Sequence, residues 1–106
     1  LDPRGRKKIL EIVTRLNREE GITIVLITHF MEEAVDADQV IVLSDGQVLC
    51  QGTPHEILTD QAMLKKAGLL PPFAAQMAME LREAGIPIAQ TCITTRELVE
   101  EICRLQ

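Results

Sequence analysis

The sequence predicts an α/β fold, in which a helix, one core strand of a parallel sheet and a β-hairpin precede a small helical part. Three patterns predict it. Apolar residues recur at helical spacing over 3–20, an apolar and largely β-branched run follows at 22–27, and a turn dipeptide at 45–46 separates two more apolar runs. A strand without polar alternation is typical of a parallel sheet that is covered on both faces.

The first helix is expected over residues 3–20. The Asp2 side chain can accept hydrogen bonds from the free N–H groups of the first turn, and Pro3 suits the first helical position because it has no N–H to lose. Gly21 provides the end, since glycine adopts the left-handed conformation at little cost. The apolar positions at helical spacing are Ile9, Ile12, Val13 and Leu16.

A polar pair, Thr28-His29, follows the run at 22–27 and precedes a short helical segment at 30–35. Ligands of open α/β sheets bind at the carboxyl ends of strands, and histidine is the side chain that changes charge near neutral pH. His29 is therefore the candidate for proton transfer or phosphate sensing. Glu33 lies one helical turn further on, but two ligands do not complete a metal site, so no metal is expected.

A β-hairpin is predicted around Asp45-Gly46, the dipeptide that suits a tight turn with two positive φ angles. Its strands are expected over 40–43 and 48–50, and Gly52 should end it.

Two short helices should follow the hairpin. Thr53 and Glu56 form a capping box, in which each side chain accepts a hydrogen bond from the backbone N–H of the other, and Pro54 suits the first helical position. Asp60 can cap the next segment, which Gly68 should end.

Pro71 and Pro72 break the preceding structure and mark a boundary between a first part, residues 1–68, and a second part, residues 69–106. The second part is expected to hold two amphipathic helices that form a small extension. The apolar positions of its first helix, which should end at Gly85, are Phe73, Met77 and Leu81. The capping box Thr94-x-x-Glu97 begins its second helix, whose apolar positions are Leu98, Val99, Ile102 and Leu105.

Composition narrows the class of protein further. The 106 residues carry 11 Lys and Arg against 16 Asp and Glu, which gives a net charge of -5 and argues against an autonomous nucleic-acid binder. No apolar run approaches the ~20 residues of a membrane span, and no secretory signal is present. The 3 cysteines, at positions 50, 92 and 103, have no metal-ligand spacing, so a cytosolic protein is expected.

The chain also lacks the phosphate-binding loop Gly-x-x-x-x-Gly-Lys-Ser/Thr, whose backbone N–H groups and lysine hold the phosphates of ATP. Alone, it is expected neither to bind ATP tightly nor to hydrolyse it. Because it opens on Leu1-Asp2-Pro3 without an initiator Met, we expect it to be part of a longer protein.

The order of these motifs resembles the last part of an ABC transporter ATP-binding subunit, a P-loop NTPase. Leu-Asp-Pro at 1–3 is followed by a basic helix, by Gly-Ile-Thr-Ile-Val-Leu-Ile-Thr-His at 21–29, by the hairpin, and by Gly-Thr-Pro-x-Glu at 52–56. The segment His-Phe-Met-Glu-Glu-Ala at 29–34 is most similar to the energy-coupling-factor branch, which imports cobalt and vitamins. The resemblance covers about residues 1–60, and residues 69–106 match the branch's helical extension more weakly.

The resemblance implies roles for two residues. Asp2 matches the aspartate of the D-loop, which in the family crosses the dimer interface toward the opposite ATP site. His29 matches the switch histidine, which contacts the γ-phosphate and the attacking water.

The Walker A, Q-loop, signature and Walker B motifs of the family are missing from the sequence. One segment, Leu43-Ser44-Asp45-Gly46-Gln47, differs from the family's signature motif by one letter. Because this segment lies at the predicted hairpin, we interpret the similarity as coincidence.

The resemblance also implies cofactors and partners for the intact parent. These are ATP and Mg²⁺, a second ATPase subunit that pairs through residues 69–106 and the D-loop, and a transmembrane coupling subunit. The parent would be a peripheral subunit on the cytoplasmic face of the cell membrane, with no nucleic acid and no direct contact with the imported solute. No cofactor is expected in the chain alone.

Two other classes stay open. One is a non-catalytic interaction module that dimerises through residues 69–106, which oligomeric state would test through Leu98 and Ile102. The other, least favoured, is an independent metal hydrolase built on His29 and Glu33, which would require a metal in the purified protein.

Overall fold

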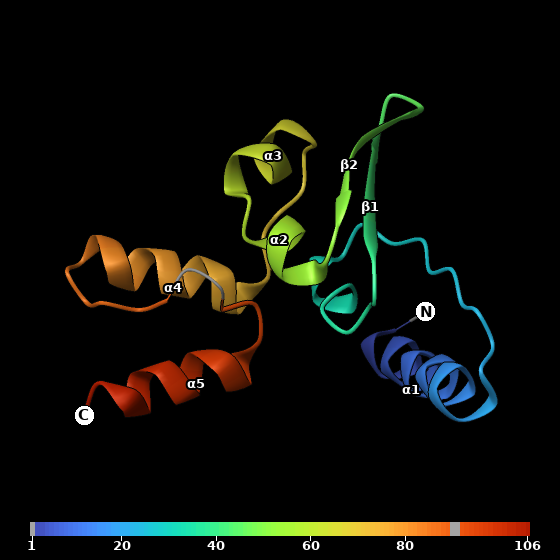
Figure 1. Ribbon diagram of the computed structural model, residues 1–106, viewed down its shortest axis with the longest axis horizontal. Coiled ribbons are helices and arrows are strands. Elements are labelled where there is room, and N and C mark those ends of the chain that lie inside the picture. Colours follow the sequence, from blue (N-terminus) through green and yellow to red (C-terminus); the bar gives the residue numbers. More distant parts are fainter. Residues whose placement is uncertain (1, 90–91) are drawn as a thin grey trace.

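The computed structural model describes residues 2–89 and 92–106 and forms an elongated molecule (Figure 1). The hairpin and two short helices occupy its middle, α1 lies at one end, and α4 and α5 lie side by side at the other. In chain order the elements are α1 (Pro3–Glu20), the 3₁₀ helix η1 (Met31–Glu33), β1 (Val40–Ser44), β2 (Gln47–Gly52), α2 (Pro54–Leu58), α3 (Gln61–Lys66), α4 (Phe73–Glu83) and α5 (Thr95–Arg104). None of the helices in the described ranges is both long and apolar enough to cross a membrane.

The first helix has the predicted bounds and the predicted caps. The Asp2 carboxylate accepts a hydrogen bond of 2.7 Å from the Gly5 N–H, and Gly21 ends the helix with a φ of 67°. No residue of α1 is buried, and Ile9, Ile12 and Leu16 are exposed. The helix is therefore held to the rest of the described chain by polar contacts at its ends rather than by its apolar face.

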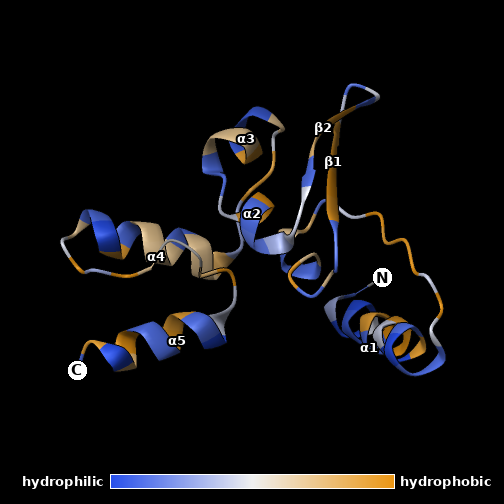
Figure 2. Ribbon diagram, viewed as in Figure 1, coloured by the Kyte–Doolittle hydropathy of each residue, from blue (hydrophilic) through white to orange (hydrophobic). Residues whose placement is uncertain are grey.

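The core strand predicted over 22–27 is not formed, and the predicted burial of this segment on both faces is wrong for this structure. Residues 22–27 run as an apolar connection between α1 and η1 (Figure 2), with Val25 84% and Ile27 92% exposed. A strand requires a neighbour for its N–H and C=O groups. The two strands of the described chain pair with each other and leave no neighbour for this segment.

The predicted hairpin is confirmed. β1 and β2 pair antiparallel, with a register irregularity between Val42 and Leu43. Asp45 and Gly46 have φ angles of 52° and 75°, as a two-residue turn that matches the strand twist requires. The signature-like segment 43–47 therefore forms the hairpin tip and does not begin a helix, so it presents no helix N-terminus to a phosphate.

One hydrophobic cluster lies between the hairpin, η1 and the helices α2 and α3. It consists of the buried side chains Met31, Val42, Ile57, Leu58, Leu64 and Ile93. Both predicted helix starts are present, with the complete capping box of Thr53 and Glu56 at α2 and an Asp60 cap at α3. Ile93 belongs to the second part of the sequence, so the two parts share a core contact.

A second cluster holds α4 and α5 together. Its buried members are Ala74, Ala78, Ile88, Cys92 and Leu98. The predicted apolar face of α4 is thus only partly correct. Met77 and Leu81 pack against the cluster, but Phe73 is 58% exposed, because Ala74 and Ala78 occupy the face of α4 toward α5. In α5, Leu98 is buried within the chain, whereas Val99 and Ile102 are exposed, as is Leu105 directly after the helix.

Candidate functional site

The candidate site is the loop that carries His29, between the apolar connection and η1. The Phe30 N–H donates a 3.0 Å hydrogen bond to the Thr28 hydroxyl oxygen, and that hydroxyl donates to Glu33 Oε1 at 2.5 Å. The Phe30 ring lies against the His29 imidazole, with 4.2 Å between the ring centroids and 35° between the planes. The loop therefore orients an exposed imidazole whose two nitrogens make no hydrogen bond to another described residue.

An ion pair joins this loop to the first helix. Arg6 Nε donates to Glu33 Oε2 at 2.7 Å and Arg6 Nη2 donates to Glu33 Oε1 at 2.6 Å, a bidentate arrangement between residues 27 positions apart. The Arg6 guanidinium carbon also lies 4.6 Å from the centroid of the Phe30 ring, within the range of a cation–π contact. One side chain of α1 thus contacts Phe30, whose ring lies against His29, and Glu33, which follows in η1.

The surroundings of Glu33 keep its carboxylate charged. The hydrogen bonds from Arg6 lower the pKa of Glu33, and although burial acts in the opposite direction, the Thr28 hydroxyl and the charge of Arg6 also lower it. The Glu33 side chain is 11% exposed and that of Arg6 is 34% exposed. Charge-assisted, bidentate pairs of this kind fix the relative orientation of the groups that they join.

The structure does not support a metal site on His29 and Glu33. Both carboxylate oxygens of Glu33 accept hydrogen bonds from Arg6, so a metal would have to displace that guanidinium. No group of three or more His, Cys, Asp or Glu side chains in residues 2–89 and 92–106 is arranged to hold a metal ion.

Asp2 and His29 share no hydrogen bond in the described chain, but the first turn of α1 connects them. Asp2 accepts from the Gly5 N–H, and the next residue, Arg6, contacts the His29 loop. Sequence reasoning identified Asp2 and His29 and missed Arg6. The signal in the sequence was the opposite charge of Arg6, one helical turn after Asp2, and Glu33, one helical turn after His29. Spacing along the chain cannot show that two residues so far apart form a pair.

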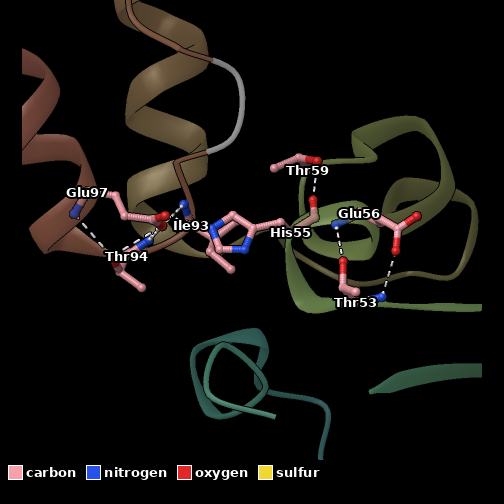
Figure 3. Close-up of polar contacts among 7 residues, drawn as sticks. All are labelled: Thr53, His55, Glu56, Thr59, Ile93, Thr94 and Glu97. Atoms are coloured by element: carbon pink, nitrogen blue, oxygen red, sulfur yellow. Dashed lines mark hydrogen bonds and ion pairs between the residues drawn. The ribbon is translucent and has the colours of Figure 1, made fainter. Parts of the chain in front are cut away.

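A second polar junction joins α2 to α5 (Figure 3). His55 Nε2 lies 2.6 Å from Glu97 Oε2, while Glu97 Oε1 accepts from the backbone N–H groups of Ile93 at 2.9 Å and Thr94 at 3.1 Å. Burial raises the pKa of Glu97, but the hydrogen bonds from Ile93, His55 and Thr94 outweigh burial and leave the pKa below its ordinary value. Glu97 therefore both completes the capping box of α5 and ties α5 to the hairpin half of the molecule.

The residues fit one contact to a phosphate and not a whole nucleotide site. His29 offers an exposed imidazole, and Arg6, a cation that contacts its loop through Phe30, is engaged by Glu33. The sequence contains no phosphate-binding loop.

Comparison with known proteins gives a consistent result over the full chain. The sequence model of the family described as "Energy-coupling factor transporter EcfA1 C-terminal domain" matches residues 72–106. The chain is 51% identical over 104 residues, 98% of its length, to the energy-coupling factor transporter ATP-binding protein EcfA1 of Caldanaerobacter subterraneus subsp. tengcongensis. It is 50% identical to the protein of the same name from Geobacillus kaustophilus and 48% identical to that from Symbiobacterium thermophilum, each over 99% of its length. The chain spans 37–38% of the length of these relatives.

Proposed function

Because the chain belongs to the family of energy-coupling factor transporter ATP-binding proteins and corresponds to the carboxyl-terminal part of its members, we propose that it is part of an ATP-hydrolysing subunit that powers a membrane importer. The observation that carries the proposal is the sequence identity of 37–51% to proteins of this one name along almost the whole chain. The imported solute, cobalt or a vitamin, would be selected by other subunits.

In this proposal His29 is the switch histidine. A neutral imidazole beside a phosphate accepts or donates one hydrogen bond, so it can register whether the γ-phosphate is present and orient the attacking water. The exposure of His29 supports this role. The nucleotide and its Mg²⁺, when bound to the intact subunit, supply the reacting phosphoryl group and neutralise its charge.

Asp2 is proposed as the D-loop aspartate that reaches the opposite ATP site of a dimer. Asp2 is exposed and caps α1. The cap is compatible with contact to a partner, since Oδ1 accepts from the Gly5 N–H and Oδ2 accepts no hydrogen bond from the described residues. Residues 69–106 are proposed as a helical extension that helps to pair two ATPase subunits. The exposed apolar side chains Val99 and Ile102 on α5, and Leu105 directly after it, support this pairing.

The location and the remaining partner follow from the same proposal. The subunit would bind a transmembrane coupling subunit and would lie on the cytoplasmic face of the membrane. The 106-residue chain alone would be inactive, because the motifs that hold ATP are absent from its sequence.

A chimera tests the proposal. This chain replaces the matching 104 residues of the Caldanaerobacter relative, and ATP hydrolysis is measured for the chimera and for its His29→Ala variant. We expect the chimera to hydrolyse ATP and His29→Ala to lower kcat by about 100-fold or more, the usual contribution of a positioned acid–base group. A folded chimera without ATPase activity, or ATP turnover by the 106-residue chain that His29→Ala abolishes, would contradict the proposal.

A second candidate is a non-catalytic interaction module, which the exposed face of α5 also favours. Leu98 is unsuitable for testing it because this side chain is buried within the chain, so Leu98→Glu would disrupt folding. Val99→Glu and Ile102→Glu alter exposed positions instead. If the purified chain associates and these changes leave its oligomeric state unaltered, α5 is not the interface.

A further inference from the structure

Three contacts converge on the loop of His29 from the first turn of α1. Arg6 donates two hydrogen bonds to Glu33 and stacks over Phe30, and the Phe30 ring lies against the imidazole of His29. Gly5, the residue before Arg6, is held by the Asp2 cap. A continuous path of direct contacts therefore runs from Asp2 to His29.

We propose that the Arg6–Glu33 pair is a positioning device that couples the Asp2 end of α1 to the imidazole of His29. The inference rests on the proposed role of His29 in ATP hydrolysis and adds two residues to that site. Neither Arg6 nor Glu33 would touch the nucleotide. Both would act by fixing where the His29 ring lies and by transmitting movement of α1 to it.

The geometry of the pair suits positioning. The planar Arg6 guanidinium donates to both oxygens of the Glu33 carboxylate. A change in the orientation of the guanidinium plane would therefore change the orientation of the carboxylate with it. Glu33 in turn accepts from the Thr28 hydroxyl, which holds the Phe30 N–H. Both residues beside His29 in the sequence, Thr28 and Phe30, are thus fixed by groups that depend on Arg6.

A second ion pair of the same helix provides a matched control. Arg18 Nη1 lies 3.2 Å from Asp38 Oδ1, and this pair also joins α1 to the segment that follows η1. It is a single contact between side chains that are 56% and 71% exposed, and it touches no residue of the His29 loop. The control therefore matches the test pair in helix and in charge, and differs from it in the contact with the loop, in exposure and in having one hydrogen bond to the carboxylate, with a second, of 3.5 Å, from Arg18 to the Asp36 carbonyl oxygen.

The experiment uses the chimera described above and measures kcat and KM for ATP together with thermal unfolding. Arg6→Gln, Glu33→Gln and the double variant should each lower kcat by about tenfold, as expected when a catalytic group is displaced, and leave KM within about twofold. The double variant should be no slower than either single variant, because each breaks the same link. Arg18→Gln should leave kcat unchanged, and Arg6→Lys, which keeps the charge but not the fork, should give an intermediate rate.

The His29→Ala background separates positioning from a general loss of structure. There, Arg6→Gln should cause no further loss of kcat, because the group that it positions has been removed. A further loss of about tenfold in that background, or a loss explained entirely by a smaller folded fraction, would overturn the inference. So would equal effects of Arg6→Gln and Arg18→Gln.

The two proposals fail in different ways. If His29→Ala lowers kcat while Arg6→Gln and Glu33→Gln do not, the positioning role is wrong and the proposed function stands. If His29→Ala leaves kcat unchanged, the proposed role of His29 is wrong, and the positioning role that depends on it is wrong as well.

Discussion

The Ile93 side chain joins the two parts of the molecule, and truncating it should destabilise both. Ile93 is 1% exposed and lies in the cluster formed by the hairpin, η1, α2 and α3, although it follows α4 in the sequence. Replacing it with alanine removes three carbon atoms from a fully packed position. If the second part were a separate unit, this change would affect only the docking of that part.

The size of the loss follows from burial. At about 0.8 kcal/mol per buried carbon, the lost transfer free energy is about 2.4 kcal/mol, and the cavity left behind brings the expected loss to about 3–4 kcal/mol. Ile93→Val removes one carbon and should cost about 1 kcal/mol. Small domains have unfolding free energies of about 5–15 kcal/mol, so the alanine variant should lose a large fraction of its stability.

Urea denaturation followed by far-ultraviolet circular dichroism measures these losses. We expect one transition whose midpoint falls from wild type to Ile93→Val to Ile93→Ala, with an unchanged slope. Ile86→Ala is the control, because Ile86 is 39% exposed and losing the same three carbon atoms there should cost about 1.5 kcal/mol, well below the cost at Ile93. A loss below about 1 kcal/mol for Ile93→Ala, or a second transition confined to part of the helical signal, would refute the reasoning.

Three further predictions concern local features. Gly46→Ala should destabilise the chain by about 1–2 kcal/mol in the same denaturation assay, because a φ of 75° is strained for alanine although no atom lies within 4 Å of the new methyl group. Thr94→Ala should cost about 1 kcal/mol, since it removes the acceptor of the 3.1 Å hydrogen bond from the Glu97 N–H; Thr94→Ser should restore most of the loss. The pKa of Glu97 is lowered in the folded state, so its contribution to stability is present above its ordinary value of 4.5 and is lost as the pH falls through the lower folded pKa. Urea midpoints measured from pH 6 down to about 3 should therefore fall less steeply for Glu97→Gln than for wild type, and parallel curves would contradict this assignment.

Local signals predicted most of the fold because they act over three or four residues. The Asp2 cap, the end of α1 at Gly21 and the capping box of Thr94 depend only on nearby backbone groups, and all are present. The hairpin turn at 45–46 is of the same kind, since two residues with positive φ determine it.

The features that sequence could not predict depend on distant neighbours. Residues 22–27 have strong β propensity, but a strand forms only beside another strand, and propensity does not reveal whether one is available. Phe73 has the correct helical spacing for a buried position, yet it is exposed because the face of α4 that packs against α5 carries Ala74 and Ala78. At the site, the position of His29 was predicted from the preceding apolar run, whereas its anchoring by Arg6 arises only when α1 folds back onto η1.

The unpaired segment between α1 and η1 has a consequence for hydrogen exchange. In the described chain, the backbone N–H groups of residues 23–27 donate to no acceptor, whereas those of the hairpin and of α4 are engaged in regular hydrogen bonding. Amides without acceptors exchange with solvent almost as fast as those of an unstructured peptide. The most β-prone stretch of this sequence should thus acquire deuterium before the hairpin and α4 do. Any molecule that adds a strand beside it would be detected as a slowing of exchange at these five amides.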